Sequence, residues 1–377
     1  MGFLKAPSLI NQSLRTVNAR AGKKTPTYVR LHADSQVFTA WIIGSKMAVR
    51  WTLHRSHFPV VEGEGTCWVG GHDLVLAFSS LDFAGGKAKL NFDPAPELRD
   101  GSGLAMPIAA ADKKAERAAE NFADCDAAED FFFMPLGAFL GLLNRVLYAY
   151  SDEEYRSSMR GVKFEVVEGR LRLVASDGYR LALTCQGDRL NMGLHEGASP
   201  VALGKELEAM VKILERFPLP STVYFKVSSD HLGLEIGGEG WKFEGFVGCG
   251  FGYPDYHRAI PKEQSFAFSI DRKAFFEAIR PILPFAKSRK ETSSVELTFD
   301  PSPTVALNDE NAPIKLSFPI LEMQGKPFPL LFNARYLIEA LDHAPYETAN
   351  VIVWREESAV RIESGTYLAV IVPLRRR

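Results

Sequence analysis

The chain has 377 residues, of which 46% are hydrophobic and 24% are charged, and its formal net charge is −2 at pH 7. This composition is typical of a soluble globular protein, and the length predicts about two to three domains. No apolar run reaches the roughly 18 residues that a membrane-spanning helix needs. Residues 1–24 do not have the pattern of a signal peptide, so we expect a cytoplasmic protein. The near-neutral charge excludes a strongly basic chain but leaves room for a local basic surface that binds nucleic acid.

Helical apolar periodicity occurs six times along the chain. It is clearest at 136–150, where apolar residues recur at the i, i+3, i+4, i+7 spacing of one helix face. The six segments are 4–19, 73–83, 136–150, 205–217, one that starts after Asp271 and one that starts after Asn333. Asp271 and Asn333 suit helix N-caps. Pro281 and Pro284 should kink or end the fifth helix.

Each of the last five helical segments follows a short apolar strand, and β-rich sequence fills the gaps between them. The helices begin at intervals of roughly 65 residues, which indicates an internal repeat. Six units of one helix and about four strands pair into three domains, so we predict an α+β fold in which helices pack on antiparallel sheets. Residues 110–130 form either a polar linker or a short solvated helix, and 259–265 form a second linker.

The most regular stretch of the chain is 160–185. Val162, Phe164 and Val166 alternate with polar residues, and the alternation resumes after Glu168-Gly169 and again after Asp177-Gly178. Period-two alternation that is interrupted by short glycine-containing turns predicts an antiparallel meander with one buried face. We interpret Asp177 as a structural turn residue.

The cysteines and histidines give no sign of a metal centre or of catalysis. The four cysteines, Cys67, Cys125, Cys185 and Cys249, lie far apart, without a CxxC pair or a histidine at ligand spacing. We therefore expect buried apolar thiols, with no zinc site, no disulfide and no cofactor. The eight histidines are scattered, and P-loop, GxGxxG and GxSxG motifs are absent, so the sequence predicts a protein that is not an enzyme.

Residues 160–183, RGVKFEVVEGRLRLVASDGYRLAL, closely resemble the middle domain of the bacterial replicative sliding clamp, the β subunit of DNA polymerase III. Tyr179 stands where that family often has histidine. Three further pieces agree in order and spacing: 131–150, the linker motif YPDYHR at 253–258, and the final segments FNARYL at 332–337 and YLAVIVPLR at 367–375. The resemblance is good from about residue 130 onward, whereas residues 1–125 are divergent.

The resemblance implies a DNA-clamp fold of three similar domains, 1–125, 126–260 and 261–377, each with two helices packed on antiparallel sheets. Two chains of such a clamp form a homodimer, a pseudo-sixfold ring that encircles duplex DNA without reading its sequence. As a processivity factor in DNA replication, the ring tethers DNA polymerase, and polymerase and clamp loader bind it through short peptide motifs. The alternative is a clamp-like accessory protein that binds partner peptides without closing a ring on DNA.

The resemblance also implies three sets of site residues. The partner-peptide pocket matches Met159, Ser176, Gly178, Tyr179, Arg180, Leu181, Pro254, Arg258, Val370, Ile371, Val372, Pro373, Leu374 and Arg375. The candidates for facing DNA are Arg15, Arg20, Lys23, Lys24, Arg145, Lys205, Lys212, Arg216, Arg272, Lys273 and Arg280, with 287–290 as a further basic cluster. The dimer interface matches Ile282 and Leu283 on one side, and we assign Leu104, Met106 and Ile108 to the other. The loop 151–155 is acidic here, which should weaken any contact with phosphate.

Overall fold

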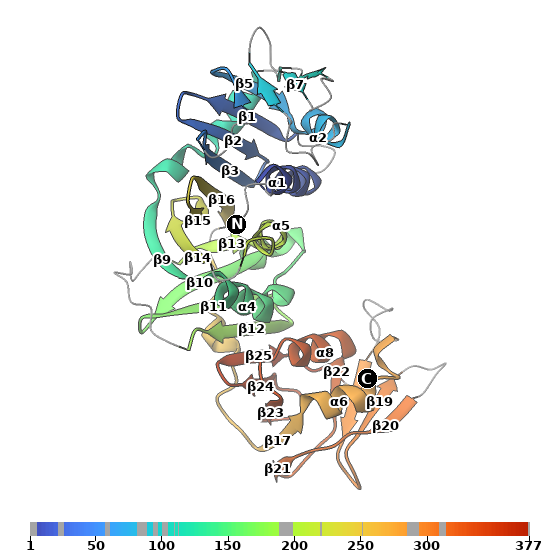
Figure 1. Ribbon diagram of the computed structural model, residues 1–377. Coiled ribbons are helices and arrows are strands. Elements are labelled where there is room, and N and C mark those ends of the chain that lie inside the picture. The colour runs from blue at the N-terminus through green and yellow to red at the C-terminus, as the bar shows by residue number, and fades with distance from the viewer. Residues whose placement is uncertain are drawn as a thin grey trace. The chain divides into compact units, whose positions relative to one another are not determined.

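The computed structural model describes residues 6–21, 26–56, 61–80, 89–92, 97–99, 105–108, 110–111, 113–187, 199–218, 221–250, 252–284, 294–308 and 314–375. Lys23, Lys24, Leu104 and the cluster 287–290 lie outside these ranges. The chain forms two compact units, and the elements of each are labelled in Figure 1. The first unit comprises Met1–Leu140 and Leu190–Gly250, and the second comprises Gly141–Arg189 and Phe251–Arg377. The division into three domains stays a prediction.

The first unit is built on one antiparallel sheet. Its strands, in spatial order, are β5 (Gly65–Gly70), β1 (Tyr28–Ala33), β2 (Val37–Ile43), β3 (Met47–His54), β16 (Trp241–Gly250), β15 (His231–Gly238), β14 (Thr222–Val227) and β9 (Glu129–Pro135). The short strand β13 (Val201–Leu203) pairs with the end of β16. A small second sheet contains β4 (Val61–Glu62), β6 (Lys89–Asn91), β7 (Glu97–Arg99) and β8 (Ala105–Pro107). The pairing of β3 with β16 joins strands from distant parts of the sequence into one continuous sheet.

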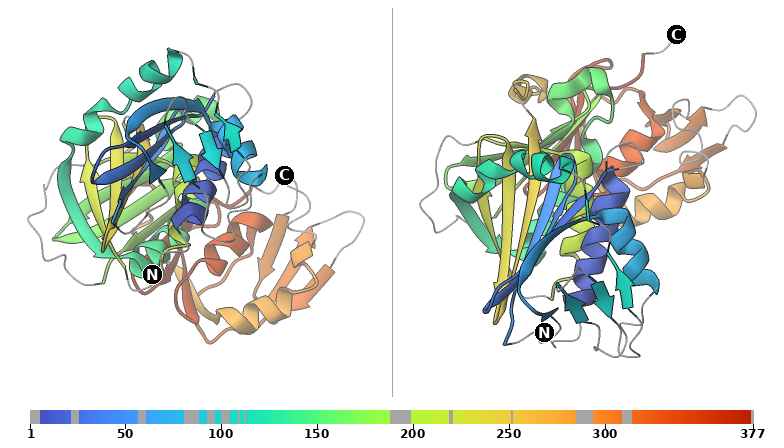
Figure 2. Two further views of the ribbon diagram at one scale, coloured as in Figure 1. Left: turned by 45° about the horizontal axis from the view of Figure 1, so that its top comes forward. Right: turned by 90° about the horizontal axis from the view of Figure 1, so that it is seen from above.

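The two faces of this sheet are covered by different helices. Helix α1 (Ala6–Ala21) packs on β2 and β3, and it also contacts α2 (Gly71–Ser80) and α5 (Gly204–Leu214), which packs on β16 (Figure 2). Side chains alternate between the faces of a strand. Trp51 therefore lies on the helix side, buried against Phe217 and Phe243, while its neighbour Arg50 lies on the opposite face.

The opposite face is covered by α3 (Lys114–Glu120) and the 3-10 helix η2 (Ala123–Ala127). Phe122 and Cys125 are buried there with Ile43, Ala48 and Phe246. The structure thus decides between the two readings of 110–130: part of the segment is a short helix whose Ala115 is buried and whose Lys114, Glu116, Arg117 and Glu120 are exposed to solvent. Beside it, Arg50 donates to Glu244 through Nε (2.8 Å) and Nη2 (2.9 Å) and to Asp126 through Nη1 (2.7 Å), next to a hollow of about 340 Å³.

The second unit repeats this design. Its main sheet has the spatial order β10 (Gly161–Val167), β11 (Arg170–Ser176), β12 (Arg180–Cys185), β25 (Tyr367–Ile371), β24 (Val360–Ser364), β23 (Thr348–Val353), β17 (Phe266–Asp271) and β21 (Glu322–Gly325). A further sheet has the order β20 (Ile314–Ser317), β19 (Thr304–Asn308), β18 (Ser294–Thr298) and β22 (Leu330–Asn333). The pairing of β12 with β25 corresponds to that of β3 with β16 in the first unit.

The predicted helices are confirmed, as is the meander. Helix α4 (Leu136–Val146) buries the predicted apolar face, and 3-10 helices η3 (Leu147–Ala149), η4 (Glu154–Met159) and η5 (Tyr256–Ala259) follow it along the chain. The Asp271 side chain caps α6 (Arg272–Ile279) by accepting from Ala274 N at 2.7 Å, and Asn333 caps α8 (Ala334–Asp342) by accepting from Arg335 N at 3.0 Å. Helix α6 ends just before Pro281, as proline requires.

Candidate functional sites

The turn between β11 and β12 is held by its own side chains. Asp177 Oδ1 accepts from the backbone N–H groups of Tyr179 and Arg180, both at 2.9 Å, so its structural role in the turn is confirmed. Gly178 has a φ of 87°, and a Cβ at that position would lie 2.4 Å from Arg156 Nη1. The positive φ favours glycine at this turn, and a larger residue would also have to displace the end of the Arg156 side chain.

Strand β25 ends beside this turn. It pairs Arg180 with Ile371, and Val372 N then donates to Tyr179 O at 2.9 Å. The side chains of Tyr179, Val372 and Leu374 are 49%, 43% and 43% exposed. Exposed apolar side chains that gather in this way are typical of surfaces that bind another protein. We call Tyr155, Arg156, Tyr179 and Val372 the Tyr179 surface. Leu374 follows two residues after Val372, and its N–H donates to Leu331 O at 2.7 Å.

Arg156 belongs to this surface, although the sequence reasoning missed it. Its guanidinium lies 4.4 Å from the ring centre of Tyr179 and 5.4 Å from that of Tyr155, and it donates to the backbone oxygen of Asp177. A guanidinium over an aromatic ring is favourable and fixes both side chains. The alternation pattern could not reveal it, because Arg156 lies in η4, outside the strands.

The other residues of the expected pocket divide by exposure. Met159 lies near Gly178, and Pro254, Arg258 and Arg375 are exposed. Ser176, Arg180, Leu181, Val370, Ile371 and Pro373 are buried, and they support the surface from beneath instead of lining it. Leu181 and Val370 pack with Val174 and Tyr256 in one core cluster. Their assignment to a peptide pocket stays a prediction.

Arg180 is the centre of a buried polar network. Its guanidinium donates through Nε to Asp177 Oδ2 at 2.9 Å, through Nη1 to Glu339, and through Nη2 to Tyr148 O at 2.7 Å. The charge also lies 4.6 Å from the ring centre of Tyr336. Burial opposes the charge, but Glu339 and Asp177 outweigh it and raise the pKa of Arg180 above its usual value. Arg180 thus connects the turn, η3 and α8.

The predicted DNA-facing residues also divide into two groups. Lys212, Arg216, Lys273 and Arg280 are exposed on or next to α5 and α6, Arg15 is exposed on α1, and Lys205 is half-buried on α5. Arg20 instead pairs with buried Glu206, and Arg145 donates to Thr184 Oγ1 at 3.4 Å. Arg272 donates to the backbone oxygens of Leu341, Asp342 and Tyr346, which places it at the C-terminal end of α8. Its donors are engaged inside the chain, and its assignment to the DNA-facing set stays a prediction.

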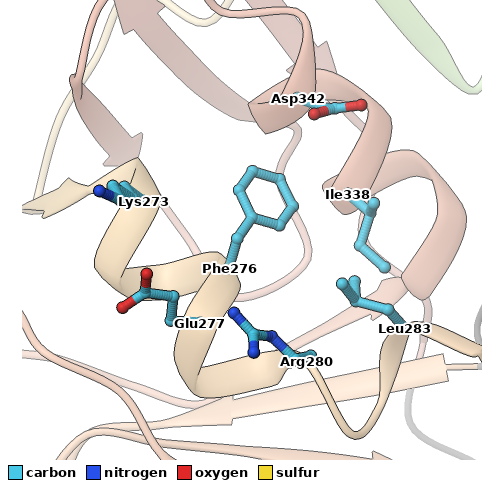
Figure 3. Close-up of a pocket in the computed structure, with 7 residues that line it drawn as sticks. All are labelled: Lys273, Phe276, Glu277, Arg280, Leu283, Ile338 and Asp342. Atoms are coloured by element: carbon cyan, nitrogen blue, oxygen red, sulfur yellow. The ribbon is translucent and has the colours of Figure 1, made fainter.

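A hollow of about 440 Å³ lies between α6 and α8. Figure 3 shows Phe276, Leu283 and Ile338 in it, with Lys273, Glu277, Arg280 and Asp342 around them. Of the expected dimer residues, Leu283 lines this hollow, whereas Ile282 is only 1% exposed. Ile108 is buried and Met106 is half-buried. Ile282 and Ile108 are therefore placed in the core of their own chain.

The thiols are free, but their surroundings differ from the expectation. Only Cys125 is fully buried, and the other three are half-buried. The folded chain brings Asp124 and Cys125 next to His231, a residue that is distant in sequence. The spacing of these residues along the sequence did not indicate this grouping. Among the described residues, no helix is long and apolar enough to cross a membrane.

Comparisons with known proteins agree with the resemblance seen in the sequence. No family model matches the chain. The beta sliding clamp of Caulobacter vibrioides (strain NA1000 / CB15N) is 28% identical over 207 residues, which cover 52% of each chain, and that of Proteus mirabilis is 23% identical over 65% of each. The chain thus spans about half the length of the first of these curated relatives.

The solved structures extend the likeness to nearly the whole chain. The DNA polymerase sliding clamp from Bacillus subtilis superposes with a TM-score of 0.77 at 17% identity, covering 97% of both chains. The DNA polymerase III beta subunit from Thermotoga maritima gives 0.72 at 19% identity, covering 98% of this chain and 97% of that one. The chain therefore has the fold of the sliding clamps.

Proposed function

We propose that the chain is a DNA sliding clamp, a processivity factor of the DNA polymerase III beta-subunit type. The observation that carries this proposal is the likeness to solved clamps over 97% or more of the chain, including the divergent first 125 residues. Two copies form a homodimeric ring around duplex DNA in the cytoplasm. The protein catalyses no reaction, and it acts by tethering other proteins to DNA.

Attraction to DNA comes from the exposed cations on the helices. Arg15, Lys212, Arg216, Lys273 and Arg280 can approach phosphates without reading bases, as a ring that moves along DNA requires. Because the described cations are few and two acidic residues, Glu277 and Asp342, accompany Lys273 and Arg280, the attraction is weak. Retention on DNA then depends on the closed ring more than on affinity.

A closed ring around circular DNA is linked to it topologically, and this link can be tested. After loading by a compatible clamp loader, the chain should stay on nicked circular DNA during gel filtration and should leave once a restriction enzyme linearises the circle. Salt that screens phosphate contacts should change this retention little. Equal retention on circular and linear DNA would contradict a ring.

Partner proteins bind at the Tyr179 surface through short extended peptides with apolar anchors. Exposed apolar side chains over a rigid turn suit such anchors, and Arg156 adds a donor at the edge. We assign the exposed Pro254, Arg258 and Arg375 to the rim of the same site, and the buried Pro373 to the support beneath it. Clamp loader and polymerase are the expected partners.

The double substitution of Pro373→Ala with Leu374→Ala should weaken binding of a clamp-binding peptide at least about tenfold, which corresponds to 1.4 kcal/mol. The change removes an exposed anchor contact at Leu374 and the support beneath it. Isothermal titration calorimetry measures the affinity. Leu321→Ala is the matched control, since Leu321 is 55% exposed next to β21 in the same unit. Unchanged affinity in the double variant would remove this site from the proposal.

A second candidate is an accessory protein that binds partner peptides as a monomer. It is favoured by the internal engagement of Arg20 and Arg272 and by the burial of Ile282, which together reduce the DNA-facing and dimer-forming groups. Sedimentation at micromolar concentration separates the two candidates. A ring gives a species of twice 41.8 kDa, and the accessory protein stays at 41.8 kDa.

A further inference from the structure

Asp124, Cys125 and His231, three residues of types that can bind a metal ion, lie close together between η2 and β15. The ligand atoms of Asp124, Cys125 and His231 all lie within 4.8 Å of one another. Cys125 Sγ is 3.8 Å from Asp124 Oδ1, and His231 Nδ1 is 3.0 Å from the same oxygen. Cys125 and His231 are buried, whereas Asp124 is partly open to solvent.

Two of the three separations are close to those around one tetrahedral ion. With bonds of about 2.0–2.1 Å to nitrogen and oxygen and about 2.3 Å to sulfur, a tetrahedral zinc ion holds its ligand atoms roughly 3.3 to 3.6 Å apart. The two distances to Asp124 Oδ1 lie within a few tenths of an ångström of that range. The ligand atoms of Cys125 and His231 lie within 4.8 Å of each other, so side-chain rotation that brings these two atoms together would place an ion among all three.

The surrounding elements hold the ligands in place. Asp124 Oδ2 accepts from Ser229 Oγ at 3.3 Å and from Asp230 N at 3.4 Å, which leaves Oδ1 directed at the cluster. The His231 ring packs on Phe122 with 4.6 Å between ring centres. Neighbours that orient the ligands are a regular part of protein metal sites, because they fix the ligand atoms before the ion arrives.

We propose that Asp124, Cys125 and His231 bind one divalent cation of the zinc class, with the fourth position open to water. A thiolate, an imidazole and a carboxylate are the ligands that zinc takes in proteins, and the softer thiolate argues against magnesium or calcium. A thiolate and a carboxylate together neutralise the two charges of the ion. The site joins η2 to the start of β15, so the ion fastens the segment after α3 to the sheet of the first unit.

The proposal concerns a site on the Arg50 side of the sheet and does not depend on ring closure or on peptide binding.

Cobalt is the first probe of the site. The full chain, reduced and stripped with EDTA, should bind one equivalent of Co²⁺ and develop the thiolate-to-cobalt charge-transfer absorption of a sulfur-ligated ion. Zn²⁺ should displace the cobalt, because zinc binds such sites more tightly. If the wild-type protein shows no charge-transfer absorption with Co²⁺, the proposal is overturned.

Substitutions then assign the ligands. Cys125→Ser should abolish the charge-transfer absorption, and His231→Gln should weaken zinc binding by more than about 100-fold, the upper end of what loss of an outer-shell partner alone causes. His32→Gln is the control for the histidine, because His32 forms a histidine–carboxylate pair with Asp34 at 3.9 Å that includes no cysteine. Cys185→Ser is the control for the thiol. Both controls should bind zinc like the wild type. Absorption that survives in Cys125→Ser would place the ion elsewhere, and circular dichroism in EDTA establishes that each variant folds.

Discussion

Replacing Arg180 with alanine should lower the free energy of unfolding by about 3 to 5 kcal/mol, the range for removing one partner of a buried ion pair. Arg180 is only 7% exposed, and Asp177 and Glu339 both direct carboxylate oxygens at it. Without the guanidinium, Asp177 and Glu339, whose side chains are only 14% and 24% exposed, lose this cation, and the backbone oxygen of Tyr148 loses its donor. The turn that carries Tyr179 should loosen as a result.

Urea unfolding monitored by circular dichroism measures this effect. The matched control is Arg335→Ala, because Arg335 donates to the same Glu339 at 2.9 Å from a side chain that is 47% exposed. Exposed pairs contribute at most about 1 kcal/mol, so the control should be almost as stable as the wild type. If the two variants unfold at the same urea concentration, Arg180 is not the centre of the network.

Replacing Trp51 with alanine should destabilise the chain by about 3 to 5 kcal/mol, as is usual when a large buried ring is removed. The Trp51 ring stacks on Phe217 at 5.7 Å, meets the edge of Phe243 at 5.0 Å, and donates through Nε1 to Ser13 Oγ at 3.2 Å. Ser13 belongs to α1, and Phe217 follows α5. Trp51 therefore fastens both helices to the sheet, and its loss should leave α1 open to proteolysis.

Trp51→Phe provides the comparison for this prediction. Phenylalanine keeps most of the ring contact but gives up the bond to Ser13, so it should cost about 1 kcal/mol, as one hydrogen bond does. Urea unfolding gives the stabilities, and limited proteolysis reports on α1. Equal losses in Trp51→Ala and Trp51→Phe would mean that the ring contacts do not hold the helices.

Local features of the fold could be predicted from the sequence because each depends on neighbouring residues. The helix face at 136–150 and the caps at Asp271 and Asn333 follow from spacings of a few residues. The alternation at 160–185 likewise predicts the strands of the meander. It does not predict that Val174 is buried, which follows from packing with Tyr256 on that face of the strand. A period of two shows which residues share a face, but not which faces are covered.

The sites depend on contacts that no local pattern encodes. Arg180 reaches Glu339, and Asp124 reaches His231, only after strands and helices from distant segments have packed. Similarly, no spacing distinguishes Arg272, which caps α8, from Lys273, which is exposed beside it. The family resemblance predicts a partner site at the Tyr179 turn, and the structure adds which residues of that turn are exposed.

The pairing of β3 with β16 has a consequence for folding of the chain during its synthesis. A ribosome that adds about 5 to 20 residues per second needs roughly 10 to 40 s to go from β3 to β16. During that time, the backbone N–H and C=O groups along one edge of β3 have no strand beside them. An unpaired edge readily adds a strand from another chain. The nascent first unit should thus depend on chaperones until residues 241–250 leave the ribosome.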